Sequence, residues 1–174
     1  MKIEIIDDFM SSYYHNIYLN MFDGAEGDDK FPWLFNDSLN GKGYKGNYYF
    51  NNVIVQMNDG YINEGLMPLF DPLLIRLKIN IGDVHRIKAN LYPWKGRRRH
   101  HQTHTDYPSG HNLRTCLYYV NDSNRVTIFD GKKKIKCKGN RAIIFDGSTP
   151  HHSTSPTDTN YGISINIDYK EKDL

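Results

Sequence analysis

The chain has 174 residues and a formal net charge of +2, and 39% of its residues are hydrophobic. This length predicts one domain over residues 1–174, and the composition excludes both an acidic disordered chain and a generally basic nucleic-acid coat protein. The first ten residues include four charged side chains, and no run of about 18 apolar residues occurs anywhere. We therefore expect a soluble, cytoplasmic protein without a signal peptide, a transmembrane segment or a membrane partner.

The N-terminal part predicts a strand, a helix and a long loop. Residues 2–9 alternate apolar and charged side chains, as a half-buried strand does. Ser11 and Ser12 can cap a helix that continues to Met21. The stretch 23–47 is rich in Gly, Asp and Asn and is interrupted only by the apolar segment FPWLF, so it predicts a long irregular loop. Such loops often cover functional sites.

The rest of the chain predicts a second helix and then a set of strands. A strand is expected at 48–56, and the spacing of apolar residues predicts a helix over 66–79, with two prolines near its start. From Val84 onward, short β-rich runs alternate with turn residues, which is typical of a sandwich or barrel. The predicted class is α+β and mainly β, with an N-terminal strand and two supporting helices on a barrel core of about 84–170.

The sequence also contains a candidate metal site. His104 and Asp106 are two positions apart, so in an extended segment both side chains project from one face. A third ligand is available where a turn after an apolar strand carries His151 and His152. Two histidines and one carboxylate leave coordination positions open, which is the arrangement of non-heme Fe(II) oxygenases. The open positions would admit O2 and a cosubstrate.

Four runs of residues carry a resemblance to a known family. They are ANLYPW at 89–94, HTDYP at 104–108, TCLYYVN at 115–121 and RAIIFDGSTPHH at 141–152. In this order and at these separations, the chain resembles the Fe(II)/2-oxoglutarate-dependent dioxygenase superfamily, and within it the prolyl 4-hydroxylase-like branch with its small phage-type members. The resemblance covers nearly the whole length. It implies a double-stranded β-helix, which is a jelly-roll, cupin-like barrel.

The resemblance also assigns roles to individual residues. It makes His104, Asp106 and His151 the Fe(II) ligands and the catalytic centre, with His152 as the alternative distal ligand. It places Tyr92 and Tyr119 in the 2-oxoglutarate pocket, where a phenol can donate a hydrogen bond to a carboxylate. The implied cofactors are Fe(II), 2-oxoglutarate as cosubstrate and O2, and ascorbate remains open as an addition.

The chain departs from the family at one position. Members usually place an arginine or lysine about ten residues after the distal histidine, where it pairs with the far carboxylate of 2-oxoglutarate. Here the stretch 153–169 has no basic residue, and residues 160–162 occupy the expected place. A basic residue from another strand is the substitute we expect. Arg114 is the first candidate, and Arg141 and Lys88 are the others.

The segment before the metal pair is strongly basic. The loop 95–101 contains Lys95 and three consecutive arginines, and it predicts either a solvated charge run or a positive rim at the mouth of the site. Such a rim would attract an acidic protein segment, a nucleic-acid phosphate or an anionic metabolite. We expect His100, His101 and His111 to be exposed.

The predicted activity is that of a hydroxylase, an oxidoreductase that inserts oxygen into an unactivated C–H bond. A prolyl or other residue of a peptide or protein is the substrate that the resemblance ranks first. Oxygenation of a nucleic acid or of a small molecule by the same chemistry is the second interpretation. The alternative of another class is a non-catalytic, metal-binding jelly-roll module that has lost 2-oxoglutarate use, and the missing basic residue is the feature that supports it.

Overall fold

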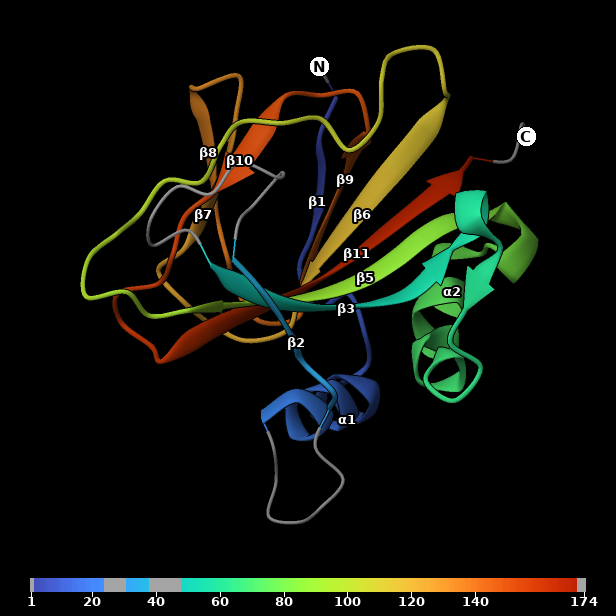
Figure 1. Ribbon diagram of the computed structural model, residues 1–174, viewed down its shortest axis with the longest axis horizontal. Coiled ribbons are helices and arrows are strands. Elements are labelled where there is room, and N and C mark those ends of the chain that lie inside the picture. Colours follow the sequence, from blue (N-terminus) through green and yellow to red (C-terminus); the bar gives the residue numbers. More distant parts are fainter. Residues whose placement is uncertain (1, 24–30, 38–47, 172–174) are drawn as a thin grey trace.

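The computed structural model describes residues 2–23, 31–37 and 48–171, which form two antiparallel sheets with α-helices on one side (Figure 1). The larger sheet has the order β1 (Glu4–Ile6), β9 (Arg141–Asp146), β6 (Leu113–Tyr119), β11 (Tyr161–Lys170), β5 (Val84–Pro93), β3 (Tyr49–Gln56) and β2 (Leu34–Asn36), with β4 (Tyr61–Ile62) paired to β3. The smaller sheet has the order β10 (His151–Ser153), β7 (Val126–Phe129) and β8 (Lys133–Lys136). The mainly β architecture predicted from the sequence is confirmed.

Two α-helices pack against the larger sheet. Helix α1 (Ser12–Asp23) begins directly after Ser11, whose carbonyl accepts the first helical hydrogen bond, and it buries Tyr18 and Phe22 against the sheet. Helix α2 (Asp71–Leu77) is shorter than the predicted helix over 66–79, because a 3-10 turn (Met67–Phe70) precedes it. No helix in the described part of the chain is long and apolar enough to cross a bilayer.

The predicted loop 23–47 lies mostly outside the described residues. Its described part, 31–37, contains the short strand β2 and packs Phe31 and Trp33 near Phe22 of α1. Two further 3-10 turns, Met57–Asp59 and Ile81–Asp83, connect the strands around α2. The sheet and its helices therefore enclose one apolar layer on the helix side.

Strands β5 and β11 form the centre of the larger sheet and present two different faces. Their antiparallel register pairs Arg86 with Asp168 and Tyr92 with Gly162, with further polar residues facing each other between these pairs. The alternate residues belong to the apolar core shared with the helices: Ile87, Ala89, Ile163, Ile165 and Ile167. Because successive side chains of a strand point to opposite faces, one face of these strands is apolar and the other is a polar ladder.

The smaller sheet covers the polar face of the larger one, on the side away from the helices (Figure 1). Between the two sheets lies a second apolar cluster that includes Tyr119, Phe129 and Phe145. Two backbone bridges, His100 to Thr154 and His104 to His151, join the segment before β6 to the smaller sheet. This segment therefore lies between the sheets and runs beside the polar ladder, from His101 near Tyr92 to Asp106 near Arg86.

Candidate metal centre

The predicted metal residues lie together at the opening between the sheets. His104, Asp106 and His151 each offer one ligand atom, and these atoms all lie within 4.8 Å of one another. His104 and His151 exchange both backbone hydrogen bonds, each at 2.9 Å, and their ring centroids are 4.6 Å apart. His151 Nε2 is 3.6 Å from a carboxylate oxygen of Asp106. Two imidazoles and one carboxylate thus converge on one point.

Backbone carbonyls orient both histidine rings. Nδ1 of His104 lies 3.2 Å from the carbonyl oxygen of Gln102, and Nδ1 of His151 lies 2.9 Å from that of Thr149. In the tautomer that donates from Nδ1, each ring keeps the lone pair of Nε2 for a metal ion. Burial lowers the pKa of His104, and the neighbouring His151 adds to this effect. The ring is therefore held in the neutral form that metal binding requires.

The backbone around Asp106 is fixed by a single carbonyl group. The carbonyl of Gly147 accepts the N–H groups of Asp106 and Tyr107 at 3.0 and 3.1 Å, while the N–H of Gly147 donates to Leu113. A side chain at position 147 would come within 3.2 Å of the Leu113 carbonyl, so the tight approach favours glycine. This turn follows β9 and leads to His151, and it joins the two halves of the candidate site.

A buried network holds the carboxylate of Asp106. Arg86 donates to Asp106 at 2.9 Å and to Asp168 at 2.7 Å, and the hydroxyl of Thr115 lies 3.1 and 2.7 Å from oxygens of the same two carboxylates. Burial raises the pKa of Asp168 to about 7, against the opposing charge of Arg86. Hydrogen bonds of this kind fix the orientation of a ligating carboxylate.

His152 does not join the cluster. Its ring lies 3.4 Å from His100 Nδ1 and 3.2 Å from the hydroxyl of Thr103, on the outer side of the segment. The sequence places His151 in a turn, but the structure has it as the first residue of β10, paired with Phe129 of β7. Because neighbouring residues of a strand point to opposite faces, His151 points inward and His152 outward.

A polar cavity of about 200 Å³ adjoins the cluster. Its walls include His104 and Asp106 together with the polar ladder of β5 and β11, namely Arg86, Lys88, Asn90, Tyr92 and Asn166, and also Tyr49, His101, Thr105 and Ser153. Lys88 donates to the hydroxyl of Tyr49 at 3.0 Å, and burial raises the pKa of Tyr92 to about 12. The cavity thus combines metal-ligating groups with neutral and positive hydrogen-bond donors, which suits an anionic ligand beside a cation.

The residues predicted for the cosubstrate pocket lie in different places. Tyr92 lines the cavity. Tyr119 is fully buried behind it and donates to Thr127 at 2.8 Å. Arg114 pairs with Glu171 and Arg141 with Asp7, and neither is among the residues that line this cavity. Of the three basic candidates, the structure brings only Lys88 to the cavity.

The structure corrects the prediction for one histidine and adds a residue that the sequence analysis missed. His101 is buried rather than exposed, because its ring stacks on Tyr92 at 5.1 Å and its backbone N–H donates to Ser153. Arg125, directly before β7, is 1% exposed and lies over the same tyrosine ring. The alternation of polar residues at 86, 88 and 90 was the available signal for the cavity wall, but no signal marked Arg125 as internal.

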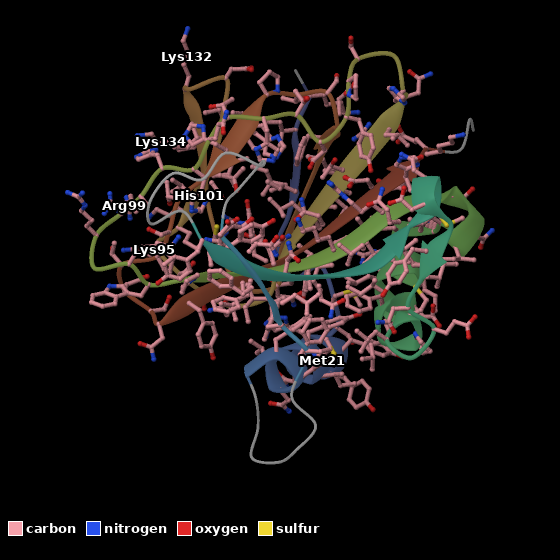
Figure 2. All side chains as sticks on the ribbon, in the orientation of Figure 1. Met21, Lys95, Arg99, His101, Lys132 and Lys134 are labelled. Atoms are coloured by element: carbon pink, nitrogen blue, oxygen red, sulfur yellow. The ribbon has the colours of Figure 1, made fainter. Side chains whose placement is uncertain are left out.

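The basic loop 95–101 is only partly solvated. Arg97 and Arg98 are exposed, whereas Lys95 donates to the carbonyl of Tyr48 and the backbone of Arg99 donates to Ser155. Figure 2 shows Lys95 and Arg99 along the same edge of the molecule as Lys132 and Lys134 of the β7–β8 hairpin. Lys134 belongs to the smaller sheet, which also contributes His151.

Neither a family model nor a curated protein matches this chain. Solved structures do match over nearly its whole length. The viral collagen prolyl hydroxylase of Paramecium Bursaria Chlorella virus-1, in a 2OG complex, has a TM-score of 0.59 at 15% identity, covering 99% of this chain and 97% of that one. The prolyl hydroxylase of Trichoplax adhaerens, in complex with a hypoxia inducible factor peptide fragment, has a TM-score of 0.57 at 18% identity, covering 97% and 83%.

An enzyme of another activity matches equally well. The non-heme alpha ketoglutarate dependent epimerase SnoN from nogalamycin biosynthesis has a TM-score of 0.61 at 10% identity, covering 97% of this chain and 78% of that chain. At such identities the likeness concerns the fold. The chain has the jelly-roll fold of the Fe(II)/2-oxoglutarate-dependent dioxygenases, like members of the prolyl 4-hydroxylase-like branch, and the predicted resemblance is confirmed at this level.

Proposed function

We propose that this protein is an Fe(II)- and 2-oxoglutarate-dependent dioxygenase that hydroxylates a C–H bond. The observation that carries the proposal is the convergence of His104, Asp106 and His151 beside a polar cavity in a jelly-roll fold. Two histidines and a carboxylate on one face suit Fe(II) and leave positions for a cosubstrate and O2. Fe(II), when bound, would activate O2, which is the oxidant for both 2-oxoglutarate and the C–H bond.

The chain's own residues would position the reactants. His104, Asp106 and His151 would hold the metal, and the bonds from Arg86 and Thr115 would keep the carboxylate of Asp106 in one orientation. From the cavity wall, Tyr92 would orient 2-oxoglutarate as a hydrogen-bond donor. The two sheets would exclude water from the inner part of the cavity, since the apolar cluster around Phe129 and Phe145 lies behind it.

For the substrate we rank a prolyl or other residue of a peptide or protein first. The support is the Trichoplax prolyl hydroxylase with its bound peptide fragment, whose fold this chain shares. Two other classes remain in the proposal. The fold of SnoN favours a small molecule, and the exposed Arg97 and Arg98 of the basic loop favour a nucleic acid. Binding to single strands that weakens steeply with salt would select the nucleic acid.

The proposal is tested by adding 2-oxoglutarate to the Fe(II)-loaded protein without oxygen and recording the visible spectrum. Bidentate chelation of Fe(II) by the 2-oxo acid produces a charge-transfer band, which we expect in the native protein. His104→Ala should abolish the band and the release of succinate in air, because the variant lacks one ligand. His152→Ala is the matched control, since its ring lies outside the cluster, and it should keep both.

The opposite results would end the proposal. If the His104→Ala protein still released succinate at the native rate, the assigned metal site would be wrong. If native protein bound Fe(II) but gave neither band nor succinate, the metal-binding module without 2-oxoglutarate use would replace the enzyme.

A further inference from the structure

Arg125 is a buried cation with incomplete bonding. Its guanidinium carbon is 4.1 Å from the ring centroid of Tyr92, which lines the cavity beside the candidate metal site. Nε donates to the carbonyl of Thr154 at 3.0 Å, but Nη1 has no hydrogen-bond partner among the residues that the structure describes. A buried donor without a partner is costly, so this nitrogen is available for a ligand atom.

The surroundings of Arg125 also lack an opposite charge. None of the ion pairs formed within 2–23, 31–37 and 48–171 includes it, and its neighbours are Tyr92, Tyr119 and His101. His101 Nε2 is a second buried nitrogen without a partner in the described structure, and this ring also lines the cavity. Since a buried charge is destabilising unless it is paired, the missing component is an anion.

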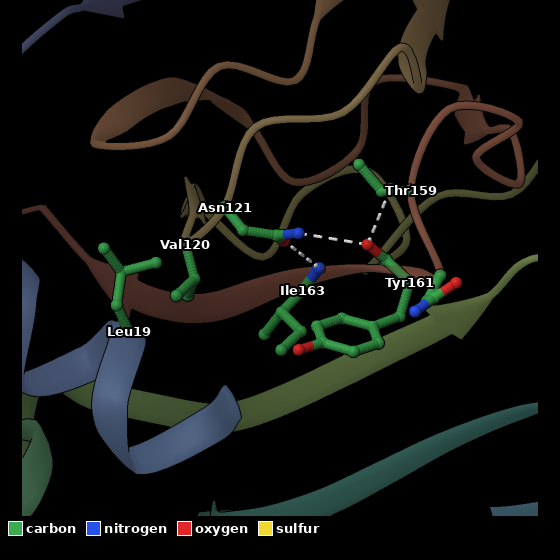
Figure 3. Close-up of a pocket in the computed structure, with 7 residues that line it drawn as sticks. Leu19, Val120, Asn121, Thr159, Tyr161 and Ile163 are labelled. Atoms are coloured by element: carbon green, nitrogen blue, oxygen red, sulfur yellow. Dashed lines mark hydrogen bonds between the residues drawn. The ribbon is translucent and has the colours of Figure 1, made fainter. Parts of the chain in front are cut away.

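Gly162 provides the space that Arg125 occupies. A Cβ at position 162 would contact Cδ of Arg125 and lie 2.7 Å from its Nη1, so any larger residue would displace the guanidinium. Gly162 pairs with Tyr92 across β11 and β5. Figure 3 shows how Asn121 fixes this part of β11: its amide donates to the carbonyl of Tyr161 at 3.0 Å and accepts the N–H of Ile163 at 2.7 Å.

We propose that Arg125 binds the far carboxylate of 2-oxoglutarate, and that Gly162 is the residue that admits it. The inference rests on the proposed function. It explains how a chain without a basic residue over 153–169 can use this cosubstrate: the charge comes from the residue before β7 on the opposite sheet, and it fills the space above a glycine of β11. Tyr92 and Tyr119, which border Arg125, then belong to the same pocket.

The test compares two ligands that differ only in the far carboxylate. The metal-loaded protein is titrated without oxygen by calorimetry, with 2-oxoglutarate and with 2-oxopentanoate, which has the same chain length but one carboxylate. We expect native protein to prefer 2-oxoglutarate by roughly 10- to 100-fold, the usual worth of one hydrogen-bonded charge. Arg125→Met should remove this preference by weakening 2-oxoglutarate alone. Lys88→Met, the matched control within the same cavity, should keep it.

A variant that moves the guanidinium to another position distinguishes loss of the charge from general damage to the fold. In an Arg125→Ala background, which empties this space, Gly162→Arg would return a guanidinium to it from β11, and we expect it to restore part of the preference. Gly162→Ala alone should weaken 2-oxoglutarate but not 2-oxopentanoate, because the methyl group displaces Arg125. If Arg125→Met fails to fold, Gly162→Ala and Arg125→Lys decide by the same ratio.

The outcomes separate this inference from the proposed function. If native protein binds neither 2-oxo acid, the proposed function fails, and the inference fails with it. If native protein prefers 2-oxoglutarate, and Arg125→Met keeps that preference while Lys88→Met loses it, the function stands and the inference is overturned. Loss of the preference in Arg125→Met and Gly162→Ala, with Lys88→Met unchanged, supports both.

Discussion

Two arginines are balanced in opposite ways: half-buried Arg86 lines the cavity, and buried Arg125 lies over the ring of Tyr92 in the cavity wall. Arg86 lies between two carboxylates, at 2.9 Å from Asp106 and 2.7 Å from Asp168. Arg125 is surrounded by aromatic rings and has no carboxylate partner within the described part of the chain. Arg86 is therefore part of the folded protein's own charge balance, whereas Arg125 has no counter-charge among the described residues.

The network around Arg86 lies beside the candidate metal site and pairs one positive side chain with two carboxylates. Burial by itself would lower the pKa of Arg86, but the charges of Asp168 and Asp106 outweigh it and raise that pKa. The hydroxyl of Thr115 has one proton for two carboxylates, so it can donate to only one of them at a time. Burial raises the pKa of Asp168, so it favours the protonated form of that carboxyl group, while the charge of Arg86 opposes this.

The largest effect should come from removing each arginine in turn. Arg86→Met leaves two buried carboxylates without a cation, and we expect it to lower the free energy of unfolding of the metal-free protein by about 3–5 kcal/mol. Arg125→Met removes a charge that has no partner, so the free energy of unfolding should stay unchanged or rise. Urea denaturation of both variants and the native protein measures the difference.

Equal losses of unfolding free energy in the two variants would contradict the proposed difference between Arg86 and Arg125. They would mean that Arg125 is stabilised by contacts such as its hydrogen bond to Thr154 rather than reserved for an anion. A second series of denaturations with 2-oxoglutarate and the metal tests the ligand role of Arg125, since a ligand stabilises the state that binds it. Adding both should raise the unfolding free energy of native protein more than that of Arg125→Met.

An intermediate effect should appear in the pH dependence near Arg125. Burial lowers the pKa of His101 well below its ordinary value of 6.5, and the charge of Arg125 adds to this. Just below pH 6.5, His101 therefore binds a proton in the unfolded chain but not in the folded protein. Above pH 6.5 the ring is neutral in both states and does not reduce the free energy of unfolding. As the pH falls below 6.5, this free energy decreases by at most about 1.4 kcal/mol per pH unit.

The measurement is a series of urea denaturations of metal-free protein between about pH 7 and 5. His101→Gln should show a shallower decline than native protein, because glutamine does not titrate. His15, whose pKa burial also lowers, lies far from the cavity beside Tyr118, so His15→Gln is the control for a general histidine effect. An unchanged slope in His101→Gln would show that this ring does not titrate as its burial implies.

Much of the fold and of the candidate metal site could be predicted from the sequence. The strand pattern from Val84 onward follows from alternating apolar residues, and these strands occur from β5 to β11. The candidate metal ligands His104 and Asp106 are two positions apart in one segment, so their relative placement can be read from the sequence. His151 could be found because it follows a recognisable apolar strand. Signals of this kind are local, and the sequence carries them directly.

The other end of the cavity depends on contacts between distant strands. Arg125 directly precedes a strand, and only its closeness to Gly162 and Tyr92 makes it internal. The burial of His101, which lies outside the strands, likewise depends on Tyr92 of β5. Pairing across a sheet is set by three-dimensional register, so a linear pattern does not reveal it.

The smallest effect is expected at Arg114, the first candidate from the sequence for the far carboxylate. Its partner Glu171 is 64% exposed, and ion pairs of this kind contribute about 0–1 kcal/mol. Arg114→Ala should therefore lower the unfolding free energy by no more than that and leave the preference for 2-oxoglutarate intact. If instead it removed the preference while Arg125→Met did not, the charge that receives the cosubstrate would come from β6. The contrast between Arg86 and Arg125 would then concern stability alone.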